Sequence, residues 1–238
     1  MLRFLGIDLP QADVCERDLI THPRTVANHS LKTRKGCHMG LPQRVPVITP
    51  AEYLRLERAA TYRSEYFRGE IFAMAGGTPK HSLIKANVMG TLWSRLRGLP
   101  CRAYDSDLRI KSPTGLYTYP DASVICSELE VDDENQDTVL NPTLLVEVLS
   151  KGTEAYDRGK KFDHYRTMPS LREYVLVSQD EPMIQRFLRN DDNTWTLTAV
   201  AGLDQTVTLC SIGIDLPLAE VYERIDFSTD GPEEQTPL

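Results

Sequence analysis

The sequence has few cysteines and no closely spaced pair of them. Its five cysteines are scattered along 238 residues, at Cys15, Cys37, Cys101, Cys126 and Cys210. Zinc sites and disulfide-rich frameworks are typically marked by recurring, closely spaced cysteines, so this spacing argues against both as the basis of the fold. The pattern predicts free thiols in a reducing compartment.

Long apolar runs are also missing. No segment approaches the roughly 18 uninterrupted apolar residues of a membrane-spanning helix. The first ten residues, MLRFLGIDLP, lack the charged start and long apolar core of a secretory signal. The sequence therefore predicts a cytoplasmic protein without a membrane segment.

An excess of positive charge is also missing. The chain has 27 basic and 34 acidic residues, a formal net charge of −7. This balance argues against a protein that coats nucleic acid through a general basic field, because such binding depends on many lysines and arginines. Any nucleic-acid binding would need a local basic patch or metal ions.

Size and hydropathy favour one large domain with irregular ends. An apolar content of 41% is enough for a sizeable core. We interpret residues 1–46 as a disordered arm, or as upstream sequence translated from an early start codon with Met39 as the true start. Residues 47–225 form the predicted domain, and residues 226–238 have the composition of an acidic disordered tail.

Capping residues and apolar spacing predict the elements of this domain. Thr49 and Pro50 begin a helix that runs to about Ala59, and SEYFRGEIFAMAG is a hairpin pattern in which Glu70 begins the second strand. A second helix is predicted over about 81–97, with an apolar stripe at four-residue intervals. Later strands are LYTYPDASVIC, NPTLLVEVLS, EYVLVS, MIQRFLR and TWTLTAV, the last three forming a meander. The fold class is α/β, a mixed sheet flanked by helices.

Two ionisable residues occupy predicted buried positions, where charged side chains are rare. Glu147 lies in the middle of the apolar run 144–149, which is typical of a strand buried on both faces. In the predicted helix from Glu154 to Met168, Lys161 falls on the same side as Arg158, Phe162, Tyr165 and Met168, and Lys160 points the opposite way. Because burying an isolated charge is costly, this carboxylate and ammonium predict a shared site with a cation.

Asp121, which follows Pro120 at the start of the preceding strand, is the third candidate. If the two strands are neighbours, Asp121 and Glu147 can approach one point, where they repel unless a cation lies between them. Oxygen ligands favour Mg²⁺ or Mn²⁺ over zinc. Such an ion can bind a phosphodiester oxygen and activate water. Lys161 would position or deprotonate that water, or neutralise the phosphate.

Each candidate also has a structural interpretation. Asp121 after proline is compatible with a turn residue, Glu147 with the partner of a nearby arginine, and Lys161 with a side chain that reaches past Phe162 to water. The functional interpretation therefore depends on the three residues together. The acidic stretch at residues 127–137 is interpreted as a solvated loop, with metal binding left open.

These residues carry a resemblance to a known nuclease family. Pro120-Asp121, Glu147 within an apolar strand, and a lysine resemble the PD-(D/E)XK nuclease superfamily. More narrowly, GEIFAMAGGTPKH, YPDASVI, NPTLLVEVLS and EAYDRGKKFDHYR are similar to the Uma-two family of restriction endonucleases, over about residues 48–225. The resemblance implies a restriction-endonuclease-like fold, Mg²⁺- or Mn²⁺-dependent phosphodiester hydrolysis, nucleic acid (DNA) as partner, and a homodimer.

Residue by residue, the resemblance assigns Asp121 and Glu147 as metal-binding acids, Lys161 as the catalytic lysine and Glu70 as a further metal ligand. His81 matches a recurrent histidine without an assigned role. The superfamily lysine usually stands two positions after the second acid, where this chain has Leu149. The resemblance therefore moves that function to Lys161 on the following helix.

The sequence thus predicts a Mg²⁺-dependent DNA endonuclease with a site of two carboxylates and a lysine. The alternative is a catalytically silent nuclease-fold protein that serves as a nucleic-acid-binding or dimeric interaction module. A weaker alternative is the hydrolysis of small phosphoesters. Arg102, Arg109, Lys111, Lys151, Arg158 and Lys160 are candidates for a phosphate-facing patch, and each is at least equally compatible with an ordinary solvated surface position.

Overall fold

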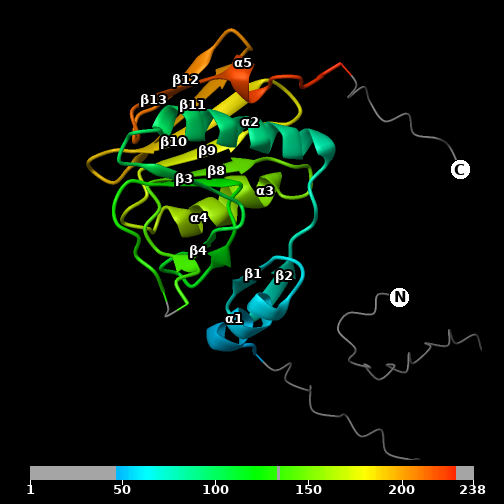
Figure 1. Ribbon diagram of the computed structural model, residues 1–238, viewed down its shortest axis with the longest axis vertical. Coiled ribbons are helices and arrows are strands. Elements are labelled where there is room, and N and C mark those ends of the chain that lie inside the picture. The colour runs from blue at the N-terminus through cyan, green and yellow to red at the C-terminus, as the bar shows by residue number, and fades with distance from the viewer. Residues whose placement is uncertain (1–46, 133–134, 229–238) are drawn as a thin grey trace, which may run out of the picture. The chain divides into compact units, whose positions relative to one another are not determined.

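The structure is a computed structural model that describes residues 47–132 and 135–228. These residues belong to one compact unit, shown in Figure 1. The predictions for residues 1–46, and for the tail beyond residue 228, lie outside the described residues.

The described part of the chain mixes helices and strands throughout. Its first half contains α1 (Pro50–Ala59), β1 (Ser64–Phe67), β2 (Glu70–Ala73), α2 (Pro79–Leu96), β3 (Arg102–Asp105), β4 (Arg109–Lys111), β5 (Tyr117–Thr118), β6 (Ala122–Ile125) and β7 (Thr138–Val139). Its second half contains β8 (Leu144–Val148), α3 (Glu154–Tyr156), the π-helical turn η1 (Asp157–Lys161), α4 (Phe162–Tyr165), β9 (Glu173–Val177), β10 (Met183–Arg189), β11 (Trp195–Ala201), β12 (Thr206–Leu209), β13 (Ile214–Pro217) and α5 (Leu218–Val221).

The first helix and hairpin form where their local sequence predicts. Thr49 Oγ1 accepts a hydrogen bond from the backbone N–H of Glu52 at 3.2 Å, and proline opens the helix. The hairpin turns at Arg68 and Gly69, whose φ angles are 48° and 93°. Two positive φ angles in a two-residue turn match the twist of the strands on either side. Glu70 accordingly begins β2.

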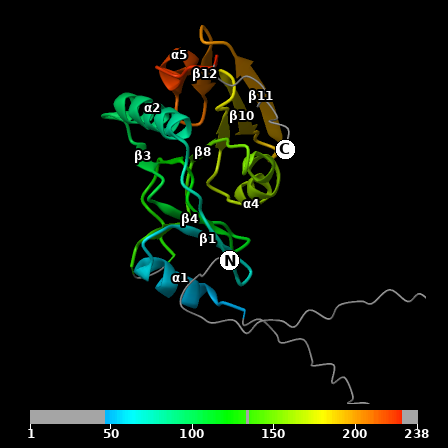
Figure 2. The same ribbon diagram turned by 90° about the vertical axis from the view of Figure 1, so that its right-hand side faces the viewer.

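A six-stranded mixed sheet is the centre of the fold. Its strand order is β11-β10-β9-β8-β6-β3, with β8 parallel to β9 and the other pairs antiparallel. Figure 2 shows α2 on one side of β8 and α4 on the other. Val146 and Val148 pack with the α2 side, whereas Leu145 and Leu149 pack with Tyr165 of α4. The predicted mixed α/β sheet and the meander β9-β10-β11 are confirmed.

A second sheet, ordered β2-β1-β5-β4-β7, takes part of a stretch that we predicted as one strand. LYTYPDASVIC divides at Pro120: β5 joins the second sheet and β6 joins the six-stranded sheet. Proline has no N–H to give to a ladder, so the break falls at that residue. The division leaves Asp121 immediately before β6.

Two of the cysteines predicted to be free form a disulfide, Cys101–Cys126. The ladder between β3 and β6 pairs Arg102 with Ile125, so the cysteines stand opposite each other one position further along. Because the two cysteines are 25 residues apart in the sequence, their pairing can be predicted only once the register of the strands is known. The prediction of free thiols was therefore wrong for this pair, whereas Cys210 is free and exposed.

The predicted helix from Glu154 to Met168 is interrupted. Its middle is the π-helical turn η1, and α4 ends at Tyr165. The buried side chains are those of Asp157, Lys161, Tyr165 and Met168, and Lys160 is exposed as predicted. Arg158, which we placed on the buried side, is instead partly exposed and pairs with Glu154 at 2.7 Å.

Three members of the predicted phosphate-facing patch are held in ion pairs instead. Arg109 is only 3% exposed and contacts Asp137 at 2.7 Å. Lys111 forms an ion pair with Asp132 at 2.6 Å, and Arg158 forms one with Glu154 at 2.7 Å. The pairs Arg109–Asp137 and Lys111–Asp132 hold the described part of the acidic stretch at 127–137 against the fold, so interpreting that stretch as simply solvated was incomplete.

Replacing Arg109 tests its structural role. Besides its ion pair with Asp137, the Arg109 guanidinium donates hydrogen bonds to Thr138 Oγ1 at 2.9 Å and Tyr119 Oη at 2.8 Å. Because buried hydrogen bonds to a charged group are lost together, we expect Arg109→Met to lower the free energy of unfolding by about 2 to 3 kcal/mol. Urea unfolding measures this loss. The control is Arg102→Met on the exposed start of β3, with an expected change below about 0.5 kcal/mol; equal effects would contradict the structural role.

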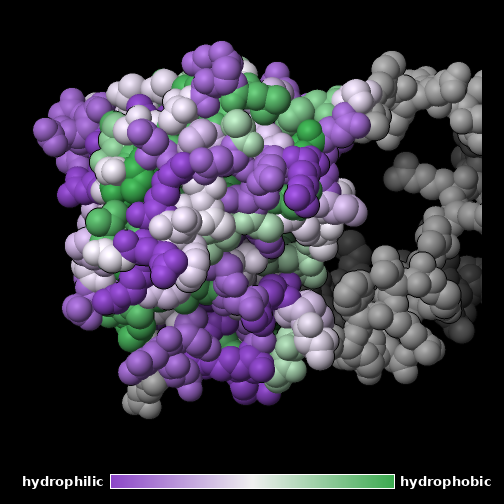
Figure 3. All heavy atoms as spheres, turned by 45° about the horizontal axis from the view of Figure 1, so that its top comes forward, coloured by the Kyte–Doolittle hydropathy of each residue, from purple (hydrophilic) through white to green (hydrophobic). Residues whose placement is uncertain are grey.

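Hydrophobic residues are scattered over one face of the described residues. Figure 3 shows a largely hydrophilic face with smaller hydrophobic patches between. Along α2, Ile84, Val88, Leu92 and Leu96 are buried as predicted, but Trp93 is 61% exposed. Among the described residues no helix is long and apolar enough to cross a membrane.

Candidate active site

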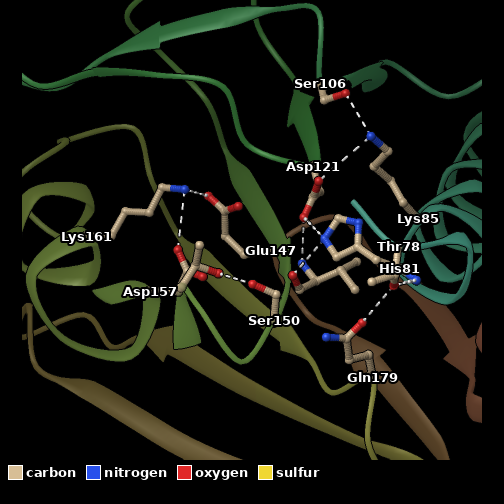
Figure 4. Close-up of polar contacts among 12 residues, drawn as sticks. Thr78, His81, Lys85, Ser106, Asp121, Glu147, Ser150, Asp157, Lys161 and Gln179 are labelled. Carbon is tan, nitrogen blue, oxygen red and sulfur yellow. Dashed lines mark hydrogen bonds and ion pairs between the residues drawn. The ribbon is translucent and has the colours of Figure 1, made fainter. Parts of the chain in front are cut away.

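The pairing of β6 with β8 brings the two predicted acids together. Ala122 is paired with Val146 in this antiparallel ladder, so the next position along places Asp121 opposite Glu147. Asp121 lies just before the first paired residue, and its side chain turns toward the backbone of Val148 and toward His81 of α2. Glu147 instead points to Lys161. Figure 4 shows Asp121 and Glu147 side by side, with Lys161 beyond Glu147 and His81 beyond Asp121.

Lys161 is held by three carboxylates. Its Nζ lies 2.8 Å from Glu147 Oε1, 3.2 Å from Glu65 Oε1 and 3.4 Å from Asp157 Oδ1. Tyr165 Oη also donates to Glu147 Oε1, at 2.8 Å. The ammonium group is therefore fixed from β1, β8 and η1 at once, and the second sheet contributes to the cluster through Glu65.

Burial and the charge of Lys161 shift the pKa of Glu147 in opposite directions, and burial and the surrounding acids do the same to the pKa of Lys161. Burial raises the pKa of Glu147 to about 8; Lys161 opposes that rise, and Asp157 and Asp121 add to it. For Lys161, burial alone would lower the pKa, but Glu147 and the other surrounding acidic groups outweigh it and raise the pKa well above its usual range. Lys161 therefore stays charged at neutral pH, while Glu147 binds a proton easily unless a cation replaces it.

Asp121 has a different set of partners. Its Oδ2 accepts a hydrogen bond from the backbone N–H of Val148 at 2.8 Å and lies 3.4 Å from His81 Nε2. Lys85 Nζ lies 4.0 Å from Oδ1 and donates to Ser106 Oγ at 3.1 Å. Burial opposes ionisation, but His81 and the Val148 N–H outweigh it and lower the pKa of Asp121. Asp121 is therefore a carboxylate at neutral pH.

The donor set fits a hard divalent cation. Asp121 uses Oδ2 and Glu147 uses Oε1 for strong contacts with the protein. Among the described residues no hydrogen bond reaches Asp121 Oδ1 or Glu147 Oε2, so each acid retains an oxygen for another ligand. The described residues contain no group of three or more His, Cys, Asp or Glu side chains arranged to hold a metal. Mg²⁺ suits such a site because it is commonly bound through one or two carboxylates and keeps several waters.

The charge of the cluster favours the same ion. Four acids, Glu65, Asp121, Glu147 and Asp157, surround two lysines, Lys85 and Lys161. With every acid ionised and His81 neutral, the local charge is −2. A divalent cation would cancel this charge, whereas a proton on Glu147 cancels only half of it.

The structure thus gathers Asp121, Glu147 and Lys161, the three residues predicted to act together. Glu70 is exposed, and within the described residues its side chain makes no hydrogen bond or ion pair with the cluster. Its predicted role as a metal ligand stays a prediction. Glu65, five residues earlier on the same hairpin, is the acid that contacts Lys161.

Sequence reasoning missed Glu65, Asp157 and Lys85. Asp157 lies one helical repeat before Lys161, and that i, i+4 spacing is a signal that could have found it. Glu65 follows a serine in a half-apolar strand and carries no such signal. Lys85 lies on α2 next to a stripe that we interpreted as core, and only the approach of α2 to Asp121 reveals its place.

Comparison with known proteins identifies a family. The model of the Uma2 family, described as "Putative restriction endonuclease", matches residues 50–219. Two similar proteins come from Synechocystis sp., and both are described as uncharacterized. The protein slr1290 is 38% identical over 183 residues, which cover 76% of this chain and 95% of slr1290. The protein sll1609 is 35% identical over 157 residues, which cover 66% of this chain and 89% of sll1609.

A solved structure shares the fold. It is the crystal structure of "a putative nuclease belonging to DUF820" from Anabaena variabilis, with a TM-score of 0.60 and 22% sequence identity. The match covers 72% of this chain and 96% of that one. At this level of identity the likeness shows the fold, so the chemistry of the site must be argued from its own residues.

Proposed function

The chain belongs to the Uma2 family, and from that premise we propose that it is a Mg²⁺-dependent endonuclease that hydrolyses phosphodiester bonds of DNA. Asp121 and Glu147 would hold the cation, and Lys161 would complete the site. Homodimer formation, which the sequence resemblance implies, stays a prediction.

One observation carries this proposal. Asp121, immediately before β6, and Glu147 of the neighbouring strand β8 lie at the same end of the β6–β8 ladder. Each has one carboxylate oxygen free of hydrogen bonds from the described residues, and a charged lysine contacts the second acid. A buried carboxylate with a raised pKa beside a second carboxylate is an unfavourable arrangement for structure alone, and such perturbed groups gather at functional sites. The family description supports phosphodiester hydrolysis as the chemistry.

Each residue then has a role that follows from its contacts. When bound, Mg²⁺ supplies a Lewis acid that polarises the phosphodiester and favours ionisation of water. Asp121 and Glu147 would hold the cation, since each has a carboxylate oxygen without a hydrogen bond from the described residues. Lys161 is fixed in the ionised state, so its role is to place positive charge beside the phosphate as negative charge develops, rather than to remove a proton. Glu65 and Asp157 keep its ammonium group in place.

A plasmid assay tests the proposal. We expect the wild type to convert supercoiled DNA to the nicked form with Mg²⁺ or Mn²⁺, and we expect an excess of EDTA to stop the reaction. Turnover of a chromogenic phosphodiester without DNA retention at low salt would instead indicate a hydrolase of small phosphoesters. Mn²⁺ binding without any hydrolysis would contradict the enzymatic proposal.

The raised pKa of Glu147 predicts a pH dependence for cation binding. The pKa is about 8, so at lower pH a cation must displace a proton. We expect Mn²⁺ affinity to rise by up to about tenfold per pH unit between pH 6 and 8 and to level off above that. Calorimetry across this range measures the slope and the proton released; an affinity that is independent of pH would contradict the assignment of Glu147.

The same pKa gives a stability test without metal. A carboxyl whose pKa is higher in the folded than in the unfolded protein binds more protons in the folded state, so its contribution is complete below about pH 4.5 and is lost as pH rises through about 8. The metal-free wild type should therefore lose unfolding free energy over this interval relative to Glu147→Gln, which lacks the titrating group. Urea unfolding at several pH values compares the two; parallel profiles would contradict the shift.

A further inference from the structure

His81 links the two strands of the proposed cation site. It lies in the first turn of α2, where its backbone N–H donates to Thr78 Oγ1 at 3.1 Å. Its Nε2 lies 3.0 Å from the carbonyl oxygen of Val148 and 3.4 Å from Asp121 Oδ2. Both of these atoms are acceptors, so Nε2 carries the hydrogen and donates. Figure 4 shows the imidazole of His81 next to the carboxylate of Asp121.

Asp121, Val148 and His81 each contact the other two. The N–H of Val148 donates to Asp121 Oδ2 at 2.8 Å, and the carbonyl of Val148 accepts from His81. Val148 directly follows Glu147, so the spacing of the two acids depends on this peptide group. With Oδ2 committed to these donors, the carboxylate of Asp121 is turned so that Oδ1 remains for a cation.

Gly77 allows the imidazole to occupy this position. A Cβ on Gly77 would lie 2.7 Å from His81 Nδ1, closer than real Cβ contacts permit, and 3.2 Å from its Cγ, which is also a tight contact. Nδ1 is buried, and no hydrogen-bond partner for it is found among the described residues. The φ angle of Gly77 lies outside the left-handed region, so the close approach to His81, rather than the backbone, requires glycine there. Gly76 has nothing within 4 Å of the equivalent position.

We propose that Gly77 and His81 form a positioning pair that orients the Asp121 carboxylate for the divalent cation. The inference rests on the proposed function, because it concerns the same cation site. Outer groups that orient a metal ligand typically change metal affinity or activity by about 10 to 100-fold when they are replaced. His81 would act in this way through Asp121, and Gly77 through His81.

A mutant cycle in the full-length protein tests the proposal. Mn²⁺ affinity is measured by calorimetry in the wild type, Gly77→Ala, His81→Ala and the double variant, with thermal melts to check folding. We expect Gly77→Ala to weaken Mn²⁺ binding about tenfold or more. In the His81→Ala background the same change should have almost no effect, because the ring that the methyl group would displace is gone.

Two variants serve as controls. Gly76→Ala makes the same chemical change next to an open space, and it should bind Mn²⁺ within about twofold of the wild type. His81→Gln retains a side-chain N–H donor and should lose less affinity than His81→Ala. If His81→Ala does not fold, the comparison of Gly77→Ala with Gly76→Ala still decides the outcome.

Three results would overturn the positioning pair: equal Mn²⁺ affinity for Gly77→Ala and Gly76→Ala, an equal effect of Gly77→Ala with and without His81, or no Mn²⁺ binding by the wild type. Plasmid nicking on the same samples separates this inference from the proposed function. Coupled Mn²⁺ binding without nicking would sustain the positioning pair and contradict the endonuclease. Nicking by the wild type, without any dependence of the Gly77→Ala effect on His81, would sustain the endonuclease and contradict the positioning pair.

Discussion

Lys161→Met should abolish DNA cleavage while leaving cation binding in place. The ammonium group contacts Glu147 at 2.8 Å and is held by Glu65 and Asp157 beside the acids proposed to carry the cation. Removing a preorganised charge or proton-transfer group from a reacting centre typically costs about 10² to 10⁴ in rate. The cation loses a competitor for Glu147, so we expect Mn²⁺ affinity to stay equal or increase.

The same variant should also destabilise the metal-free protein. Lys161 is 5% exposed, and its loss leaves three carboxylates close together without their shared partner. Removing one side of a buried ion pair costs about 3 to 5 kcal/mol. Protonation of Glu147 relieves part of this repulsion, so the loss should be larger at pH 9 than at pH 6. Urea unfolding at the two values measures it.

Lys160→Met is the matched control for Lys161→Met. Lys160 is adjacent in η1, but its side chain is exposed. The same chemical change should therefore leave nicking nearly intact, apart from any loss of a weak DNA contact. If Lys161→Met cleaves DNA as well as Lys160→Met, the assignment of the lysine is wrong.

Asp121→Asn and Glu147→Gln should each remove Mn²⁺ binding and reduce cleavage to background. Each substitution keeps the size of the side chain and removes one of the two negative charges proposed to hold the ion. Their effects on folding should differ. Glu147→Gln relieves the cost of a buried carboxylate, and Lys161 keeps two acidic partners, so the metal-free variant should remain folded. Calorimetry and thermal melts on both variants give the two readouts.

Glu220→Gln serves as the control for these acids. Glu220 pairs with Arg95 at 2.6 Å, on α5 at the α2 side of the sheet. The substitution removes one carboxylate from the protein without touching the cluster, so Mn²⁺ binding should not change. Binding that survives in both Asp121→Asn and Glu147→Gln would return these acids to a structural role.

Local patterns were sufficient for most elements and for the three central residues. A glutamate inside an apolar strand and a lysine on the apolar side of a helix are each costly to bury alone. The cost of their burial is offset only when the two charges pair with each other. Glu147 and Lys161 could therefore be found without knowing the fold. The helix start at Thr49 was equally readable, because a cap acts within one turn.

The remaining features depend on contacts between distant segments. Glu65 reaches Lys161 only because the second sheet lies beside the helix that carries the lysine, and the Cys101–Cys126 pair exists only in the register of β3 on β6. Arg109 looked like a surface cation, yet tertiary contacts bury it against Asp137. Composition and periodicity carry no information on such pairings, which is why the outer part of the site was missed.

Plasmid nicking in the presence of Mg²⁺, with wild type and Glu147→Gln purified side by side, is the most direct test of the two-carboxylate and lysine centre. We expect nicking by the wild type that EDTA abolishes, and no nicking by Glu147→Gln at equal concentration and equal folding. Nicking by both proteins at the same rate would contradict the account, because the activity would then come from another site or from a contaminating nuclease.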